Sequence, residues 1–179
     1  MKKLTTIFSF LFLVLFASSC KNEKTLQGYL VENQEKKEFI TLDIPANFLQ
    51  LKSEEVDADV KKTLKSIRKV NLVGLPYKGN EATYNAEKET LNNILKKQTY
   101  KSLMSMKGKG MQIKVYYTGS SDAIDEVIVF GHGKETGVGV ARLLGDNMNP
   151  GKIIQMMNSV KMDGKGIDLK RFSALFDSK

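Results

Sequence analysis

This chain of 179 residues has one cysteine, one histidine, three prolines and no tryptophan. A single cysteine excludes any disulfide within the chain, so the fold must be stabilised by packing and hydrogen bonds. One histidine and one cysteine also exclude the common zinc sites, which draw on several such ligands. After residue 16 no apolar run approaches the roughly 20 residues that a membrane-spanning helix needs.

The N-terminus has the layout of an export signal. Lys2 and Lys3 precede a short apolar run at 7–16, and the small residues 17–19 stand directly before Cys20. This pattern is similar to a bacterial lipoprotein signal, which implies that Cys20 becomes the lipid-bearing first residue of the mature chain. We therefore expect a signal peptide at 1–19 and lipid attachment at Cys20.

Two other interpretations of this segment stay open. In the first, Ala17 and Ser19 form an ordinary small-x-small cleavage site, and cleavage there leaves Cys20 as a free thiol. In the second, the segment is not cleaved and remains as an anchor. An unpaired cysteine in an exported protein is unusual, and acylation gives it a use. Because Lys21 stands where an aspartate would retain a lipoprotein in the inner membrane, the resemblance implies the outer membrane, facing the periplasm or the cell surface.

The composition is that of a globular protein, with 41% hydrophobic and 27% charged residues. Lys and Arg outnumber Asp and Glu by 28 to 20, for a formal net charge of +8. The basic residues are dispersed and not interleaved with stacking aromatic residues, so we expect no nucleic-acid partner. A basic body held near anionic lipid headgroups gains some surface attraction.

The first half of the mature chain predicts helices and strands in alternation. Leu26, Tyr29 and Leu30 predict a short helical turn, and 39–44 predicts a strand that ends at Pro45. Ser53 is the expected N-cap of a helix with basic residues at its C-terminal end (Lys65, Arg68, Lys69) and one apolar face (Val56, Val60, Leu64, Ile67). A buried strand at 70–75 and a helix with Leu91, Ile94 and Leu95 inward follow.

From Tyr100 the hydrophobic period changes from helical to two. Strands are expected at 100–106, 111–117, 124–130 and 136–144, with turns at 107–110, 119–122 and 131–134. Asn149 then caps a helix with Pro150 in its first position. These elements predict one α+β domain with a mostly antiparallel sheet that includes a four-stranded meander, and with helices packed on one face.

The expected division of the chain is a signal peptide at 1–19, a lipidated tether at 20–37, the α+β domain at 38–160 and an amphipathic segment at 161–179. Asp168 is the expected cap of that last segment, which carries Phe172, Leu175 and Phe176. The segment either docks on the domain or lies on a membrane or partner.

Several strand and turn patterns resemble the domain-of-unknown-function family 4252. The patterns are Tyr29–Glu32 with 39–45, Tyr100–Met106, Ile124–Val129 and Gly145–Met148, so the resemblance runs from about Leu26 to Val160. Members look like exported lipoproteins of the Bacteroidota envelope with no established biochemical role. The resemblance implies localisation and fold, and it transfers no catalytic residue.

The glycine-rich segment 131–137 does not match a nucleotide-binding loop. Ile128 stands where a P-loop has its first glycine, and Glu135 follows Lys134 in place of Ser or Thr. The dinucleotide fingerprint fails too, because Thr136 occupies the place of its last glycine. We expect a hairpin turn with His132 exposed in it and not catalytic, although a triad assembled by the fold is an alternative.

The remaining candidates have structural interpretations. Asp125 and Glu126 are neighbours on a strand and point to opposite faces, so one is expected in solvent and the other beside a cross-strand lysine such as Lys114. Asp146 and Asn147 lack the spaced oxygen ligands of a calcium loop and predict a turn. The methionines either fill the core or line a groove for an apolar ligand or partner helix (Met104, Met106, Met111, Met148, Met156, Met157).

With no metal, cofactor or catalytic residue expected, we predict a non-enzymatic lipoprotein of the cell envelope. The membrane is its partner through the acyl chains on Cys20, and an envelope protein is a further expected partner. The alternative is a carrier of a small apolar ligand, held in a groove between sheet and helices. An enzyme is the third hypothesis. It ranks below the other two because the sequence shows no cluster of acid, base and nucleophile.

Overall fold

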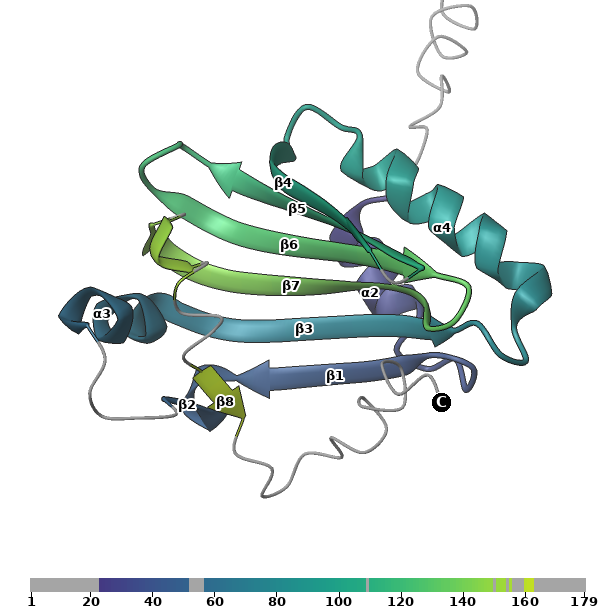
Figure 1. Cartoon of the computed structure of the whole chain (residues 1–179), viewed down its shortest axis with the longest axis horizontal. Helices are drawn as coiled ribbons and strands as arrows, with labels where there is room; N and C mark the ends of the chain where they lie inside the picture. The colour runs from purple at the N-terminus through teal and green to yellow at the C-terminus, as the bar shows by residue number, and fades with distance from the viewer. Residues whose placement is uncertain are drawn as a thin grey trace, which may run out of the picture.

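The computed structural model describes residues 23–51, 57–108, 110–149, 151–153, 155 and 160–162. An antiparallel sheet of six strands has the order β1-β3-β7-β6-β5-β4 (Figure 1). These strands are β1 (Ile40–Pro45), β3 (Ile67–Pro76), β4 (Lys101–Gly108), β5 (Met111–Gly119), β6 (Ile124–Gly133) and β7 (Gly137–Met148). The expected meander, β4 to β7, is confirmed, and so is the single α+β domain.

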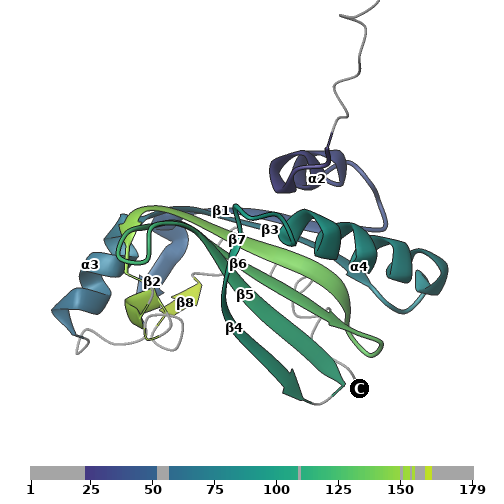
Figure 2. The same cartoon turned by 90° about the horizontal axis from the view of Figure 1, so that it is seen from above.

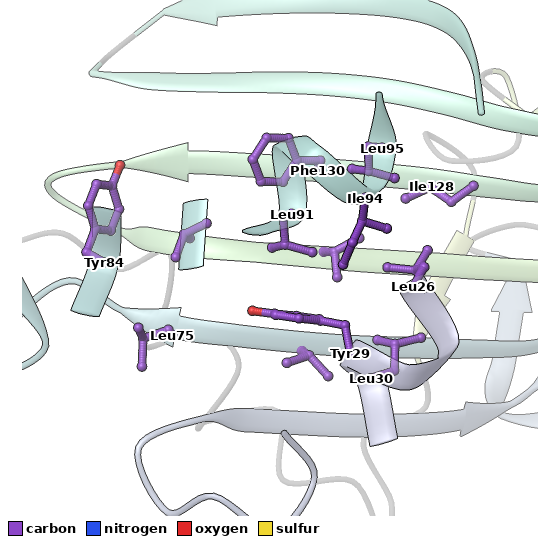
Figure 3. Packing of buried hydrophobic residues seen from close by; sticks show 13 residues of the cluster. Leu26, Tyr29, Leu30, Leu75, Tyr84, Leu91, Ile94, Leu95, Ile128 and Phe130 are labelled. Carbon is purple, nitrogen blue, oxygen red and sulfur yellow. The ribbon is translucent and has the colours of Figure 1, made fainter. Parts of the chain in front are cut away.

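Two helices cover one face of the sheet. They are α2 (Leu26–Glu32) and α4 (Glu81–Leu95), which lie together above the strands in Figure 2. The inward side chains of α4 are those that the helical spacing predicted, Leu91, Ile94 and Leu95, and they are buried. Together with α2 they pack on the sheet residues of the first core cluster (Figure 3), which include Val73, Leu75, Ile128, Phe130, Val138 and Val140.

Helix α2 belongs to this core, which differs from the expected tether at 20–37. Leu26, Tyr29 and Leu30 are at most 3% exposed, and Thr25 caps the helix by accepting a hydrogen bond from the Gly28 amide at 3.0 Å. The folded unit therefore begins about a dozen residues before the expected boundary at 38. Three apolar residues on one short helix gain more by burial against a sheet than a solvated tether would.

On the other face, the elements that the structure describes cover one end. There α3 (Ala58–Ser66), the 3₁₀ turn η1 (Ala46–Phe48) and a small antiparallel sheet of β2 (Leu49–Leu51) and β8 (Val160–Met162) lie against the strands (Figures 1 and 2). The second core cluster forms beneath them from Ile44, Val60, Ile67, Val70, Val115, Ile124, Val127, Met148 and Ile153. The β2–β8 pair has no counterpart in the sequence predictions, because three residues show no periodicity.

Helix α3 is shorter than the helix that we expected after Ser53. Its N-cap is Asp57, whose side chain accepts from the Asp59 amide at 2.7 Å, while Ser53 and Val56 lie outside the described residues. Its C-terminal end is also corrected, since Ile67, Arg68 and Lys69 belong to β3. Apolar spacing that fits the end of a helix fits the start of a strand equally well, and pairing with β1 and β7 decides it.

The later turns are tighter than the sequence suggested. Strand β6 continues through Gly133, and only residues 134–136 turn the chain into β7. Strand β7 runs to Met148 and includes Asp146 and Asn147, which we had expected in a turn; Asn147 has a positive φ of 50°. The predicted cap at Asn149 is confirmed, because its side-chain oxygen accepts from the Lys152 amide at 3.1 Å. Pro150 and residues 163–179 lie outside the described part.

Candidate functional site

The second face contains an apolar hollow of about 300 Å³, beyond the end that the described elements cover. It lies on the face opposite α2 and α4 and adjoins the second core cluster at Ile153. Figure 2 shows that the sheet curves around this side, with β4 and β5 turned away from the helices. The described lining is Leu72, Val73, Gly74, Met111, Ile113, Val127, Val129, Gly131, Thr136, Gly137, Val138, Gly139, Val140, Ala141, Leu143 and Ile153. We call this hollow the groove.

The groove has a floor of glycines. Gly139 of β7 pairs directly with Gly74 of β3 on one side and with Gly131 of β6 on the other. Three neighbouring strands therefore present no side chain at the same level, while Ile113 of β5 stands next in that row. Glycine inside a strand weakens the strand and is typical of a sharp bend or of a close approach by another group. Because Gly74 lies far from Gly131 and Gly139 in the sequence, the whole row is visible only in the strand register.

Gly131, Gly137 and Gly139 differ in whether the structure has room for a side chain at their positions. A Cβ added at Gly139 would lie 2.8 Å from the Val73 carbonyl oxygen, and one at Gly137 would lie 2.2 Å from that of Leu75. These two glycines are therefore required by close strand approach. A Cβ at Gly131 would meet nothing nearer than Ile113 Cγ1 at 3.9 Å, which is ordinary contact. Backbone crowding thus accounts for Gly139 but does not account for Gly131.

Methionines extend the apolar surface from the groove toward the edge of the sheet. Met111 lines the groove, Met106 pairs with Ile113, and Met104 pairs with Val115. Met106 is 48% exposed on the edge strand β4. Of the two interpretations of the methionines, the groove therefore applies to Met111, whereas Met148 is 1% exposed in the second core cluster and is core.

The two ends of the groove differ in polarity. Val127, Leu143 and Ile153 lie at the end that adjoins the second cluster. At the other end Thr136 is the lining residue with a polar side chain, in the tight turn that also carries the exposed residues Lys134 and Glu135. An apolar ligand with one polar end would fit this asymmetry.

The polar residues of the sheet gather on the opposite face, beside α2. Arg142 of β7 donates to Glu126 of β6 from Nε at 3.1 Å and also from Nη2, and it reaches Gln27 of α2. The expected pairing of Glu126 with Lys114 is corrected, because Lys114 pairs with Phe130, whereas Glu126 lies diagonally beside Arg142. Asp125 is exposed, as one of the two carboxylates was expected to be.

Asp43 is held by two donors on β3 on this same face. Lys69 Nζ donates to Asp43 Oδ2 at 2.7 Å, and the Asn71 amide donates to Oδ1. Burial alone would raise the pKa of the Asp43 carboxyl, but these hydrogen bonds and the Lys69 charge hold that pKa below its ordinary value. This is the chemistry of cross-strand pairing, which stabilises the sheet.

His132 lies in β6 and not in the expected turn. Its ring is half-buried and packs on that of Phe130, with centroids 5.4 Å apart. Burial lowers the pKa of His132, and the charges of Lys88 and Lys114 lower it further. The neutral imidazole is therefore favoured in a site that faces two cations and no carboxylate partner among the described residues.

The other sequence candidates do not assemble into one site. Segment 131–137 is a strand end, a turn and a second strand, so no helix N-terminus follows it. Among the described residues no three histidine, cysteine, aspartate or glutamate side chains gather to hold a metal ion. Cys20 lies outside the described part of the chain. In that described part no helix has both the length and the apolar character to cross a bilayer.

Comparisons with known proteins add a family and nothing finer. Searches among curated proteins and among solved structures each gave no significant match. The sequence matches the family described as "Domain of unknown function (DUF4252)" over residues 29–156, which spans α2 to the segment after β7. This match covers most of the chain and agrees with the resemblance inferred from its strand patterns. The chain therefore belongs to the DUF4252 family.

Proposed function

We propose that this protein is a non-catalytic binding module of the cell envelope. In this proposal acyl chains on Cys20 anchor it to the outer membrane, and the groove takes up a small apolar ligand. The observation that supports the ligand most directly is the apolar hollow with its floor of glycines, on the sheet face opposite α2 and α4. The groove lies on the sheet face opposite α2 and α4. It does not lie between the sheet and these helices, because core side chains fill that space.

The energetics support a ligand in this place. Water in an apolar hollow makes few hydrogen bonds with its walls, so an apolar group that displaces it gains about 25 cal/mol for each Å² removed from water. Gly131 costs the strand about 0.5–1 kcal/mol relative to alanine, and no backbone contact at its Cβ position requires it. A residue that lowers stability without a packing reason is expected where a ligand needs the space.

The start of the domain supports the anchoring half of the proposal. Cys20 precedes the cap residue Thr25 by five residues, a span of at most about 18 Å. Exposed ion pairs of Glu23 with Lys97 (2.9 Å) and of Lys24 with Glu32 (3.6 Å) hold the chain just before α2 against the domain. A bilayer anchor at Cys20 would thus bring the α2 face near the membrane and leave the groove on the far side.

Anchoring is tested with Cys20→Ser. We expect the wild-type chain to fractionate with membranes and to show an intact mass with added acyl groups, and we expect the variant to lose both properties. The matched control is Asn22→Gln, which changes a nearby position outside the small residues 17–19 and leaves the sulfur in place. A wild-type mature chain without acyl mass would refute the anchor and leave the groove untouched.

Ligand binding is tested with Gly131→Leu, which fills the groove from a position with open space. The control is Gly108→Leu, which adds the same side chain at an exposed glycine that has no heavy atom within 4 Å of its Cβ position. Purified proteins are extracted with solvent and the extracts compared by mass spectrometry. We expect an apolar molecule from the wild type and from Gly108→Leu, and little from Gly131→Leu; equal extracts from all three would refute the carrier role.

A second candidate function is the docking of an envelope protein at the edge strand. Exposed Met106 on β4 favours it, because a flexible apolar side chain beside unpaired strand groups is typical of adaptable interfaces. Cross-linking in intact cells tests it. We expect a partner adduct with the wild type that Met106→Lys weakens, whereas the same adducts with both chains would exclude this edge.

A further inference from the structure

We infer that the occupant of the groove is one long-chain fatty acid, with its alkyl chain along β7 and its carboxylate at the turn that carries Thr136. This inference rests on the proposed binding function and names the ligand class of the same site. Three properties of the groove lead to it: its dimensions, its lack of polar partners and the polarity of its two ends.

The groove extends along β7 and is bordered by residues of β3, β6 and β5. From Gly137 to Leu143, strand β7 alone contributes four positions on this face, over a length of about 20 Å. A volume of about 300 Å³ is at the lower end for ligand sites, which suits one linear chain and leaves no room for a diacyl lipid. The glycine row provides the depth, and Leu72 and Ile113 on the flanking strands β3 and β5 line the two sides.

The groove offers almost no hydrogen-bond partner for the backbone groups of a bound peptide. Strands β3, β7, β6 and β5 each have a neighbour on both sides, so their backbone amides and carbonyls are committed to the sheet. Among the described lining residues, Thr136 has the one polar side chain. Peptide groups buried here would lose their hydrogen bonds to water without replacement, which is costly, whereas methylene groups lose nothing. The occupant's buried part is therefore hydrocarbon.

The ends of the groove set the orientation. Ile153, Leu143 and Val127 form the end that adjoins the core, so it accepts the methyl terminus. Thr136 lines the other end and offers a hydroxyl donor to a carboxylate, and exposed Lys134 in the same turn is close enough along the chain to supply a positive charge. The carboxylate of Glu135 lies near Gly110, about 3.7–3.9 Å from its Cβ position, toward the β4–β5 turn. The anionic head is thus expected beside Lys134.

Two photoreactive palmitate analogues test both the class and the orientation. One carries a diazirine near the methyl end, the other near the carboxyl end, and each is irradiated with the purified full-length protein in phosphatidylcholine nanodiscs. Peptide mass spectrometry then locates the adduct. We expect the first probe on the peptides with Leu143 or Ile153 and the second near Thr136 or Met111. Adducts that require light are distinct from acylation at Cys20, which does not.

Groove variants give the quantitative test. A leucine side chain at position 131 would overlap with a bound alkyl chain. We therefore expect Gly131→Leu to lower the saturable adduct yield about tenfold or more, and we expect Gly108→Leu to give the wild-type yield. Ala141→Phe is the second groove variant, in case leucine at Gly131 perturbs folding. Lys134→Gln is expected to weaken competition by palmitate and to leave competition by its neutral methyl ester unchanged.

The outcomes separate this inference from the proposed function. Displacement of the probes by palmitate supports it. If a lysophospholipid or a synthetic peptide of residues 163–179 protects the groove and palmitate does not, the fatty acid is excluded while the binding groove stands. If no probe labels the groove saturably and the solvent extracts of Gly131→Leu and wild type are also the same, both proposals fail. A reversed labelling pattern overturns the assigned orientation.

Discussion

The phenol hydroxyl of Tyr29 lies 2.8 Å from Oε2 of Glu87 and donates a hydrogen bond to it. This contact joins α2, at the start of the domain, to the middle of α4. Burial raises the pKa of Tyr29, and the Glu87 carboxylate raises it further, so the hydroxyl keeps its proton and remains a donor. The residues nearest the proposed anchor are thereby fixed to the main core.

Removing that hydroxyl tests whether α2 is an integral part of the domain. We expect Tyr29→Phe to lower the free energy of unfolding by about 2 kcal/mol, because a partly buried hydrogen bond to a charged group is lost. Urea unfolding followed by circular dichroism measures this. Glu87→Gln, which keeps an acceptor, is expected to cost about half as much. An unchanged midpoint for Tyr29→Phe would mean that α2 docks without this contact.

The Arg142–Glu126 pair is expected to be costly to break from one side. Their side chains are 13% and 16% exposed, so Arg142→Met leaves the Glu126 carboxylate poorly solvated and unpaired. We expect a loss of about 3 kcal/mol in unfolding free energy. The double variant Arg142→Met with Glu126→Leu should be more stable than Arg142→Met alone, as measured by urea unfolding. Additive losses would show that the two residues act independently.

Two glycines of the groove floor should respond in opposite ways to alanine. Gly139→Ala places a Cβ 2.8 Å from the Val73 carbonyl oxygen, and we expect a loss of about 1–3 kcal/mol from forced backbone shifts. Gly131→Ala meets open space and should be neutral or stabilising by about 0.5–1 kcal/mol, because alanine loses less backbone entropy on folding. Thermal unfolding of the two variants distinguishes these cases. Equal destabilisation would contradict the open space assigned to Gly131.

His132 should make stability depend on pH in mildly acidic solution. Its pKa is lowered from 6.5 in the fold by burial and by Lys88 and Lys114, so the unfolded chain binds the proton more readily. Stability is therefore full above about pH 6.5 and falls as the pH drops below that value. Urea unfolding at pH 7.5, 6.5 and 5.5 measures the slope. Because His132 is the chain's one histidine, His132→Phe should flatten the dependence of stability on pH. Lys114→Met should reduce that dependence.

Local patterns in the sequence were sufficient for most elements. Alternation from Met111 to Tyr117 predicted β5, and the spacing of Leu91, Ile94 and Leu95 predicted the buried side of α4. Those patterns succeed because a strand and a helix each bury one face, which leaves a fixed period in the sequence. They fail where one spacing fits two structures, as at Ile67, which continues an apolar helix face and also begins β3.

Short elements and cross-strand partners escaped the same reasoning. Strands β2 and β8 have three residues each and too little pattern to detect. The partner of Glu126 was uncertain because any of several basic residues on neighbouring strands would serve, and the register between β6 and β7 selects Arg142. A shift of one residue in that register would turn every side chain to the other face.

The sequence by itself determined the α+β class and the meander, and it predicts an export signal before Cys20, because each of these depends on neighbours along the chain. Only the tertiary structure decided that Gly74, Gly139 and Gly131 stand side by side and leave a hollow between apolar walls. Those three residues are separated by as many as 65 positions, and strand pairing alone brings them together. A site made from the absence of side chains has no motif along the chain, and it appears only when the strands are in register.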